Sequence, residues 1–251
     1  MNRFLVGLSL FVCAVPRIVV AGDEASTRSG VLWINTTPDG ADLPASASLE
    51  GFPLLVRLRG EWFDFAKARP DGADLQFVSP DGKLLASQIE EWNPGEGTAS
   101  IWVRIPLIKG NERQPITLRW GGGPAAPPAS EAVFDGSNGF AVVTHMTADA
   151  KDETGALALK DTGTTDIDGV IGRARRLVGG VGITGGNDIM TLPQEASPSS
   201  TQAWVRAHKT NGRIVAWGRE QGQGKIVMQF RSPPHIGTDC WFSDGNAESK
   251  S

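Results

Sequence analysis

Glycine and proline restrict this chain to folds that are rich in turns. Of its 251 residues, 31 are glycine and 16 are proline, and both residue types destabilise helix interiors. The tripeptide Pro-Asp-Gly occurs at 38–40, 70–72 and 80–82. In such a tripeptide proline presets φ, aspartate bonds to nearby backbone and glycine adopts a positive φ. The sequence therefore predicts many short strands joined by tight turns, and not a helical bundle.

Apolar residues that alternate with polar ones between these turns predict an antiparallel β fold. In residues 99–106, Ile101, Val103 and Ile105 share one face, and the residues between them share the other. The same reasoning predicts strands at 53–58, 75–79, 99–106, 116–120, 140–146, 201–208, 213–218 and 225–230. Asn211-Gly212 predicts a hairpin turn before the strand at 213–218. We therefore expect an all-β protein of two antiparallel β-sandwich units.

A stretch rich in glycine, proline and alanine separates the two expected units. The sequence GGGPAAPPAS at 121–130 contains no core-forming side chain, and its prolines cannot join a central strand. We expect a β-sandwich domain at 28–122, a linker at 123–130 and a second β unit at 131–251.

Residues 1–21 have the layout of a secretory signal peptide. Arg3 precedes an apolar run, and Val19 and Ala21 supply small residues at the cleavage site. We therefore expect an exported protein whose mature chain begins at Gly22. No later stretch is long and apolar enough to cross a bilayer, so no membrane span is expected after the signal peptide. The formal charge of −4 argues against nucleic acid as a partner.

The sequence carries no pattern typical of an active site. His145, His208 and His235 stand far apart and share no metal-ligand spacing. Glu90 and Glu91 are adjacent, so in a regular strand they point to opposite faces and cannot act as a carboxylate pair. There is no nucleophile elbow or P-loop. The sequence thus predicts a protein that is not an enzyme and has no cofactor.

Two tryptophans and two aspartates are the candidate ligand-binding residues. Trp102 lies opposite the apolar face of residues 99–106, and Trp92 precedes a turn. Exposed aromatic rings beside polar groups bind sugar rings in many β-sandwich modules, and the alternative is that both tryptophans belong to the core. Asp71 and Asp74 are candidate calcium ligands. Turn chemistry is the preferred account of both aspartates, because their spacing is not that of a calcium loop.

Several longer motifs carry a resemblance to known families. The first half contains WINTTPDGA at 33–41, FPLLVRL at 52–58, FDFAKARPDGADLQFVSPDG at 63–82, IEEWNPGEGTASIWVRIPLI at 89–108 and ITLRWGG at 116–122. This half resembles an uncharacterised bacterial exported domain that commonly precedes a concanavalin-A-like, laminin-G-type jelly roll. The second half contains VFDGSNGFAVVTHM at 133–146, DGVIGRARRLVGG at 168–180, TQAWVRA at 201–207 and RIVAWGRE at 213–220. It resembles the start of that jelly roll.

The resemblance implies recognition of glycans or matrix proteins in the periplasm or at the cell surface of a bacterium, with no agreed catalytic residues. Some relatives carry this pair of domains ahead of a TolQ-like biopolymer-transport proton channel. The later strands of such a jelly roll do not follow here, so we expect a truncated second unit, a fragment whose apolar faces lack part of their cover.

Three functions follow from this reasoning. The preferred one is a non-catalytic exported module that binds polysaccharide or another cell-surface ligand. The alternatives are a periplasmic sensory or interaction region of a larger envelope protein, and a jelly-roll glycan hydrolase. The expected partner is accordingly a glycan or an envelope protein.

Overall fold

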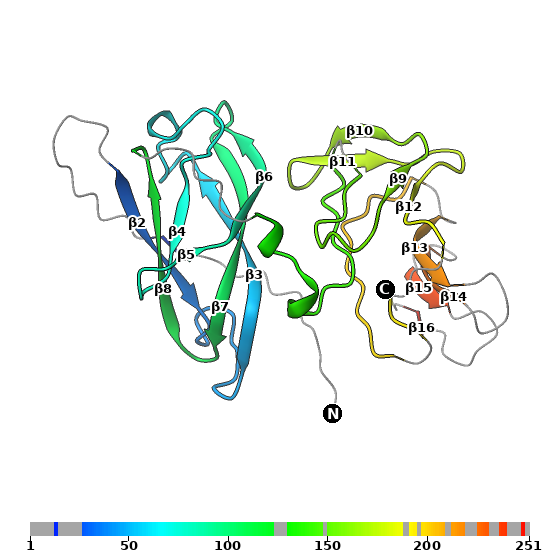
Figure 1. Ribbon diagram of the computed structural model, residues 1–251, viewed down its shortest axis with the longest axis horizontal. Helices are drawn as coiled ribbons and strands as arrows, with labels where there is room; N and C mark the ends of the chain where they lie inside the picture. The colour runs from blue at the N-terminus through cyan, green and yellow to red at the C-terminus, as the bar shows by residue number, and fades with distance from the viewer. Residues whose placement is uncertain are drawn as a thin grey trace. The chain divides into compact units, whose positions relative to one another are not determined.

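The computed structural model describes residues 13–14, 27–122, 130–147, 150–187, 191–194, 197–208, 212–218, 225–230, 236–239 and 247–248. The chain divides into two compact units, Met1–Asn187 and Asp188–Ser251. The regular structure of the described residues consists of antiparallel strands and the short 3-10 helices η1 (Phe65–Lys67), η2 (Ser130–Ala132) and η3 (Gly136–Asn138). This confirms the predicted all-β, antiparallel class (Figure 1).

Two sheets in the first unit form a sandwich (Figure 1). The five-stranded sheet has the order β1-β2-β8-β4-β5, and the three-stranded sheet has the order β3-β7-β6. The strands are β1 (Cys13–Ala14), β2 (Arg28–Asn35), β3 (Ser48–Arg59), β4 (Gln76–Val78), β5 (Leu84–Leu85), β6 (Ser87–Asn93), β7 (Thr98–Lys109) and β8 (Arg113–Trp120). Every pairing between them is antiparallel.

The core lies between the two sheets because each strand buries alternate residues. Ile101 and Val103 of β7 are fully buried, as the period-2 pattern predicts. The same buried cluster contains Leu32 and Ile34 of β2 and Phe77 of β4. Burying each such side chain contributes roughly 1.5–3 kcal/mol, so this apolar cluster fixes which face of each strand is left for other contacts.

The three Pro-Asp-Gly tripeptides form turns as predicted, but the predicted positive φ of the glycine occurs at Gly72 and Gly82 and not at Gly40. In each, the glycine N–H donates to the carbonyl oxygen of the residue before the proline, over 2.8 Å at 38–40, 2.9 Å at 70–72 and 2.9 Å at 80–82. This is the hydrogen bond that closes a β-turn with proline at its second position. Repeated turn chemistry, rather than a repeated ligand site, explains why this tripeptide recurs.

The remaining strands are short. In the first unit β9 (Lys160–Asp161) pairs with β12 (Ile183–Thr184), and β10 (Thr165–Asp168) pairs with β11 (Arg173–Arg176). The second unit contains one sheet of the order β13-β14-β15-β16, formed by β13 (Arg213–Gly218), β14 (Lys225–Phe230), β15 (Ile236–Asp239) and β16 (Ala247–Glu248).

Two of the predicted strands are wrong. Residues 140–146 and 201–208 contain no strand, because alternating apolar residues do not by themselves provide a neighbour for backbone hydrogen bonds. The N–H of Val143, for example, donates over 2.9 Å to a carboxylate oxygen of Asp152 instead of to an adjacent strand. Residues 201–208 are exposed throughout. The predicted turn residue Asn211 lies outside the described residues.

The first compact unit extends beyond the predicted linker. It runs to Asn187, so residues 130–187, which the sequence placed with a second sandwich, lie in the same unit as the first. Their side chains contact the three-stranded sheet, as shown below. Residues 123–129 and most of 1–21 lie outside the described residues, so the linker and the signal peptide stay predictions. Among the described residues, no helix has the length and apolar character needed to cross a membrane.

Candidate functional site

An extra residue in β6 changes which side chains point away from the core. Ile89 pairs with Ile101, and the next ladder pair joins Glu91 to Ser100, so Glu90 has no partner on β7. A β-bulge of this kind re-aims the side chains of the bulged strand. The outer face of the three-stranded sheet therefore receives two consecutive acidic residues.

Hydrogen bonds place both glutamates on that outer face. Trp102 Nε1 donates to Glu90 Oε2 over 2.6 Å, and Ser100 Oγ donates to Glu91 Oε2 over 3.2 Å. Trp102 and Ser100 alternate along β7 with the core residue Ile101, so both point outward. The prediction that Glu90 and Glu91 point to opposite faces is wrong, because it assumed a regular strand.

Glu90 and His145 form a buried polar pair on this face. His145 Nδ1 lies 3.5 Å from Glu90 Oε2, and the two side chains are 8% and 7% exposed respectively. The imidazole stacks on the ring of Trp102, with centroids 6.0 Å apart and planes 19° apart, and Phe134 makes an edge contact with both rings, at 5.6 Å from His145 and 5.3 Å from Trp102. Burial raises the pKa of Glu90 and lowers the pKa of His145, because it disfavours the charged form of each.

Gln88 determines which nitrogen of His145 carries a proton. Gln88 Nε2 donates to Glu153 Oε2 over 2.6 Å, so its carbonyl oxygen faces His145 Nε2 at 3.2 Å. An amide oxygen can only accept, which assigns the proton to Nε2 and turns Nδ1 toward Glu90.

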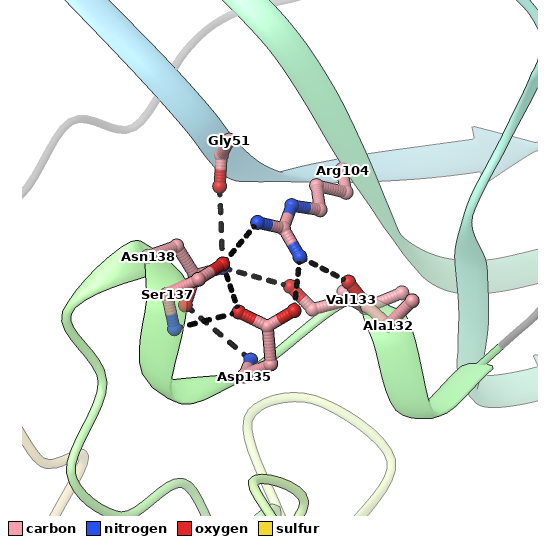
Figure 2. A network of polar contacts seen from close by, with 7 residues as sticks. All are labelled: Gly51, Arg104, Ala132, Val133, Asp135, Ser137 and Asn138. Atoms are coloured by element: carbon pink, nitrogen blue, oxygen red, sulfur yellow. Dashed lines mark hydrogen bonds and ion pairs between the residues drawn. The ribbon is translucent and has the colours of Figure 1, made fainter.

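A second polar network attaches the same segment to β7. Arg104 Nη1 donates to the carbonyl oxygen of Ala132 over 2.8 Å and to Asp135 Oδ2 over 2.5 Å, and Nη2 donates to Ser137 Oγ over 2.9 Å (Figure 2). Hydrogen bonds from Ser137 and from Arg104 lower the pKa of Asp135 to about 2. Asp135 is therefore ionised at neutral pH and forms a charge-assisted pair with Arg104.

The sequence Asp-Gly-Ser-Asn builds the local turn that presents Asp135 to Arg104. The Asp135 carboxylate accepts from the N–H of Ser137, and the side chain of Asn138 accepts from the N–H of Asp135, which makes a capping box around η3. Asn138 Nδ2 also donates to the carbonyl oxygen of Gly51 over 3.2 Å. Gly51 has a φ of 57°, and a Cβ there would lie 3.0 Å from Arg104 Nη2, so glycine is needed beside the guanidinium.

These two networks hold residues 130–147 and 150–154, here called the docked segment, on the outer face of the three-stranded sheet. An open hollow of about 450 Å³ lies beside Arg104 and is lined also by Glu50, Leu84, Pro106 and Ser137. The guanidinium at its wall is already bonded to Asp135. The arrangement is therefore one of attachment, because three of the five N–H donors of Arg104 bond to residues 132, 135 and 137.

The two tryptophans predicted to bind ligand are both half-buried. Trp92 packs against the core, with its ring centroid 5.0 Å from that of Phe65, and its Nε1 donates to the carbonyl oxygen of Pro70 over 3.0 Å. Trp102 contacts Phe134 of the docked segment at 5.3 Å. These positions favour the alternative account, in which both rings pack against other side chains.

The two aspartates predicted as calcium ligands bond to nearby backbone. Asp74 is buried and accepts from the N–H of Arg69 over 2.9 Å and from the N–H of Gly121 over 2.7 Å. Asp71 accepts from the N–H of Ala73 over 3.1 Å and lies 3.3 Å from Arg69 Nε. In the part of the chain that the structure describes, no three histidine, cysteine, aspartate or glutamate residues gather to hold a metal ion.

The tryptophan most open to solvent in the first unit was not among the predicted binding residues. Trp33 is 39% exposed, whereas its neighbours Leu32 and Ile34 are buried. It therefore lies on the outer face of the five-stranded sheet, directly across from Pro115 of β8 and on the same face as Val31, which is also 39% exposed. Residues 31–34 are all apolar, so their pattern does not show which of them point outward.

Comparisons with known proteins give one finding. A family model described as a domain of unknown function (DUF2341) matches residues 71–149. The matched range begins in the sandwich and continues into the docked segment, so it includes Glu90, Arg104, Asp135 and His145. This supports the expected domain of unknown function. No curated protein and no solved structure matches the chain, and the jelly-roll resemblance of the second half is not confirmed.

Proposed function

We propose that this chain is a non-catalytic, exported recognition module that binds polysaccharide on the outer face formed by β2, β8, β4 and β5, the strands that remain when residues 1–21 are removed. The exposure of Trp33 on that face carries the proposal. Its position across from Pro115 and beside the Val31–Thr117 pair gives a flat surface of apolar and hydroxyl groups. Sugar rings bind such surfaces by stacking on an aromatic face, while their hydroxyls bond to polar neighbours.

Export and the nature of the second half rest on the sequence. The signal-peptide layout of residues 1–21 supports export to the periplasm or cell surface. The motifs at 133–146, 168–180, 201–207 and 213–220 support a laminin-G-like second half.

A second candidate function is interaction with an envelope protein. A hollow of about 310 Å³ lies between β5 and β7, and Ile105, Leu107 and Pro115 contribute to its largely apolar lining. Leu84 at its rim is 63% exposed. Such a hollow could receive an apolar side chain of a protein partner. A glycan hydrolase is the least supported function, because the carboxyl of Glu90 is sealed between Trp102 and the docked segment.

The Trp33→Ala variant tests the proposal. Losing a stacking partner should weaken binding to the recognised polysaccharide by roughly ten-fold, since aromatic contacts contribute about 0.5–1.5 kcal/mol beyond their buried area. Trp204→Ala is the matched control, because Trp204 is 75% exposed and lies in the second unit. Affinity electrophoresis against a panel of polysaccharides gives the readout, and circular dichroism confirms that both variants fold. Unchanged binding by Trp33→Ala, or a loss confined to Trp204→Ala, would contradict the proposed face.

A further inference from the structure

Three polar side chains lie in register on the same face as Trp33. Arg119 of β8 pairs with Ser29 of β2 on one side and with Gln76 of β4 on the other. Ser29 and Arg119 are two residues from Val31 and Thr117, which pair on the outer face, and Gln76 precedes the core residue Phe77, so all three project from the outer face. Ser29 and Trp33 are four positions apart on β2, which at a rise of roughly 3.3 Å per residue is about 13 Å.

The guanidinium of Arg119 is available for a ligand. Arg119 is exposed, and within the described ranges no other group forms a hydrogen bond or an ion pair with its side chain. Arg104, by contrast, donates three hydrogen bonds to the docked segment and forms an ion pair with Asp135. An unpaired guanidinium presents a planar set of donors that matches a carboxylate or a sulfate.

The charges on this face all have the same sign. The residues that point outward from β2, β4, β5 and β8 include two charged ones, Arg113 and Arg119, and both are cationic. Arg113 lies 3.8 Å from Asp39, whose side chain is 85% exposed, and an ion pair so exposed contributes little. Yet the chain as a whole has a formal charge of −4. The outer face is thus a local cationic surface on an acidic protein.

We propose that the polysaccharide bound at Trp33 is anionic, and that Arg119 binds its carboxylate or sulfate groups while Ser29 and Gln76 bond to neighbouring oxygens. This inference rests on the proposed function and names the chemical class of its ligand. Arg113 and Arg119 are six residues apart on β8, about 20 Å at the strand rise. That separation suits a polymer with repeated negative charges better than a single sugar, since two contacts on one chain reinforce each other.

The experiment compares the wild-type protein with Arg119→Gln, Trp33→Ala and the control Arg59→Gln, whose side chain is also exposed. The probes are polygalacturonate, which carries carboxylates, dextran sulfate, which carries sulfates, and neutral dextran. Binding is measured by biolayer interferometry at low and at high salt.

We expect the wild-type protein to bind at least one of the two anionic polymers more tightly than dextran. Arg119→Gln should weaken that binding about ten-fold and reduce its salt dependence, without changing any binding of dextran. Arg59→Gln should behave as the wild type. The preferred polymer distinguishes carboxylate from sulfate recognition.

Other outcomes separate this inference from the proposed function. Equal binding of the anionic polymers by Arg119→Gln and wild type, a preference for dextran, or no binding of either anionic polymer would overturn the anionic ligand. If dextran binds and Trp33→Ala abolishes that binding, the proposed face stands without its anionic specificity. If Arg119→Gln weakens binding but Trp33→Ala does not, the anionic site stands and the stacking role of Trp33 is wrong.

Discussion

Replacing Phe134 with alanine should release the docked segment from the three-stranded sheet. The ring is 2% exposed, and its centroid lies 5.3 Å from Trp102, 5.5 Å from Phe140 and 5.6 Å from His145. Removing a buried phenyl ring costs about 3–5 kcal/mol through lost burial and the cavity left behind. We therefore expect the free energy of unfolding of the first unit to fall by about that amount. The loss also opens one side of the Glu90–His145 pair to water.

Guanidinium chloride unfolding followed by tryptophan fluorescence measures this change. Leu84→Ala is the control, because Leu84 is 63% exposed and its truncation should cost less than about 0.5 kcal/mol. Limited proteolysis supplies a second readout, since a released segment should be cut between residues 130 and 154 before the sandwich unfolds. If Phe134→Ala unfolds at the same denaturant concentration as Leu84→Ala and stays resistant to protease, the packing of this segment does not stabilise the unit.

Two further predictions concern pH and export. Burial raises the pKa of Glu90 above its ordinary value of 4.5, so the stability that its neutral form provides is complete below pH 4.5 and is lost as pH rises through the raised pKa. Glu90→Gln keeps an acceptor for Trp102 but does not titrate. The melting temperature of this variant minus that of the wild type should therefore rise between pH 4.5 and 8. A difference in melting temperature that stays constant over this range would contradict the buried pair. The lowered pKa of His145 acts in the opposite direction, with stability lost as pH falls below 6.5, but this contribution is shared by both proteins and largely cancels in the comparison. For export, mass spectrometry of the secreted protein should find Gly22 as its first residue, and a retained Met1 would count against cleavage.

The sequence predicts the parts of the sandwich that depend on local chemistry. Alternation along 99–106 and 116–120 identifies β7 and β8, and the Pro-Asp-Gly tripeptides identify three turns, because each signal lies within a few residues. Residues 140–146 show the limit of this reasoning. Their apolar pattern suits a strand, but the carboxylate of Asp152 and the outer face of another strand supply their contacts instead.

The candidate site depends on information that no short window contains. The outward turn of Glu90 follows from how β6 pairs with β7, and its partner His145 lies 55 positions further along the chain. Trp33 lies in the continuous apolar run of residues 31–34, and such a run does not report which face of the strand is exposed. The clues that favoured Trp92 and Trp102 were a neighbouring turn and a position opposite the apolar face, and neither clue reports whether another segment covers the ring.

The bulge in β6 makes position 90 a site where one residue can be deleted without disturbing the strand pairing. Glu90 lies outside the ladder, so deleting it would leave Ile89 opposite Ile101 and Glu91 opposite Ser100, and would convert the bulge into a regular strand. A homologue aligned with a one-residue gap there would keep the sandwich core but lack the carboxyl that meets His145. Such a gap, accompanied by replacement of the histidine, would identify lineages in which residues 130–154 are attached by another means.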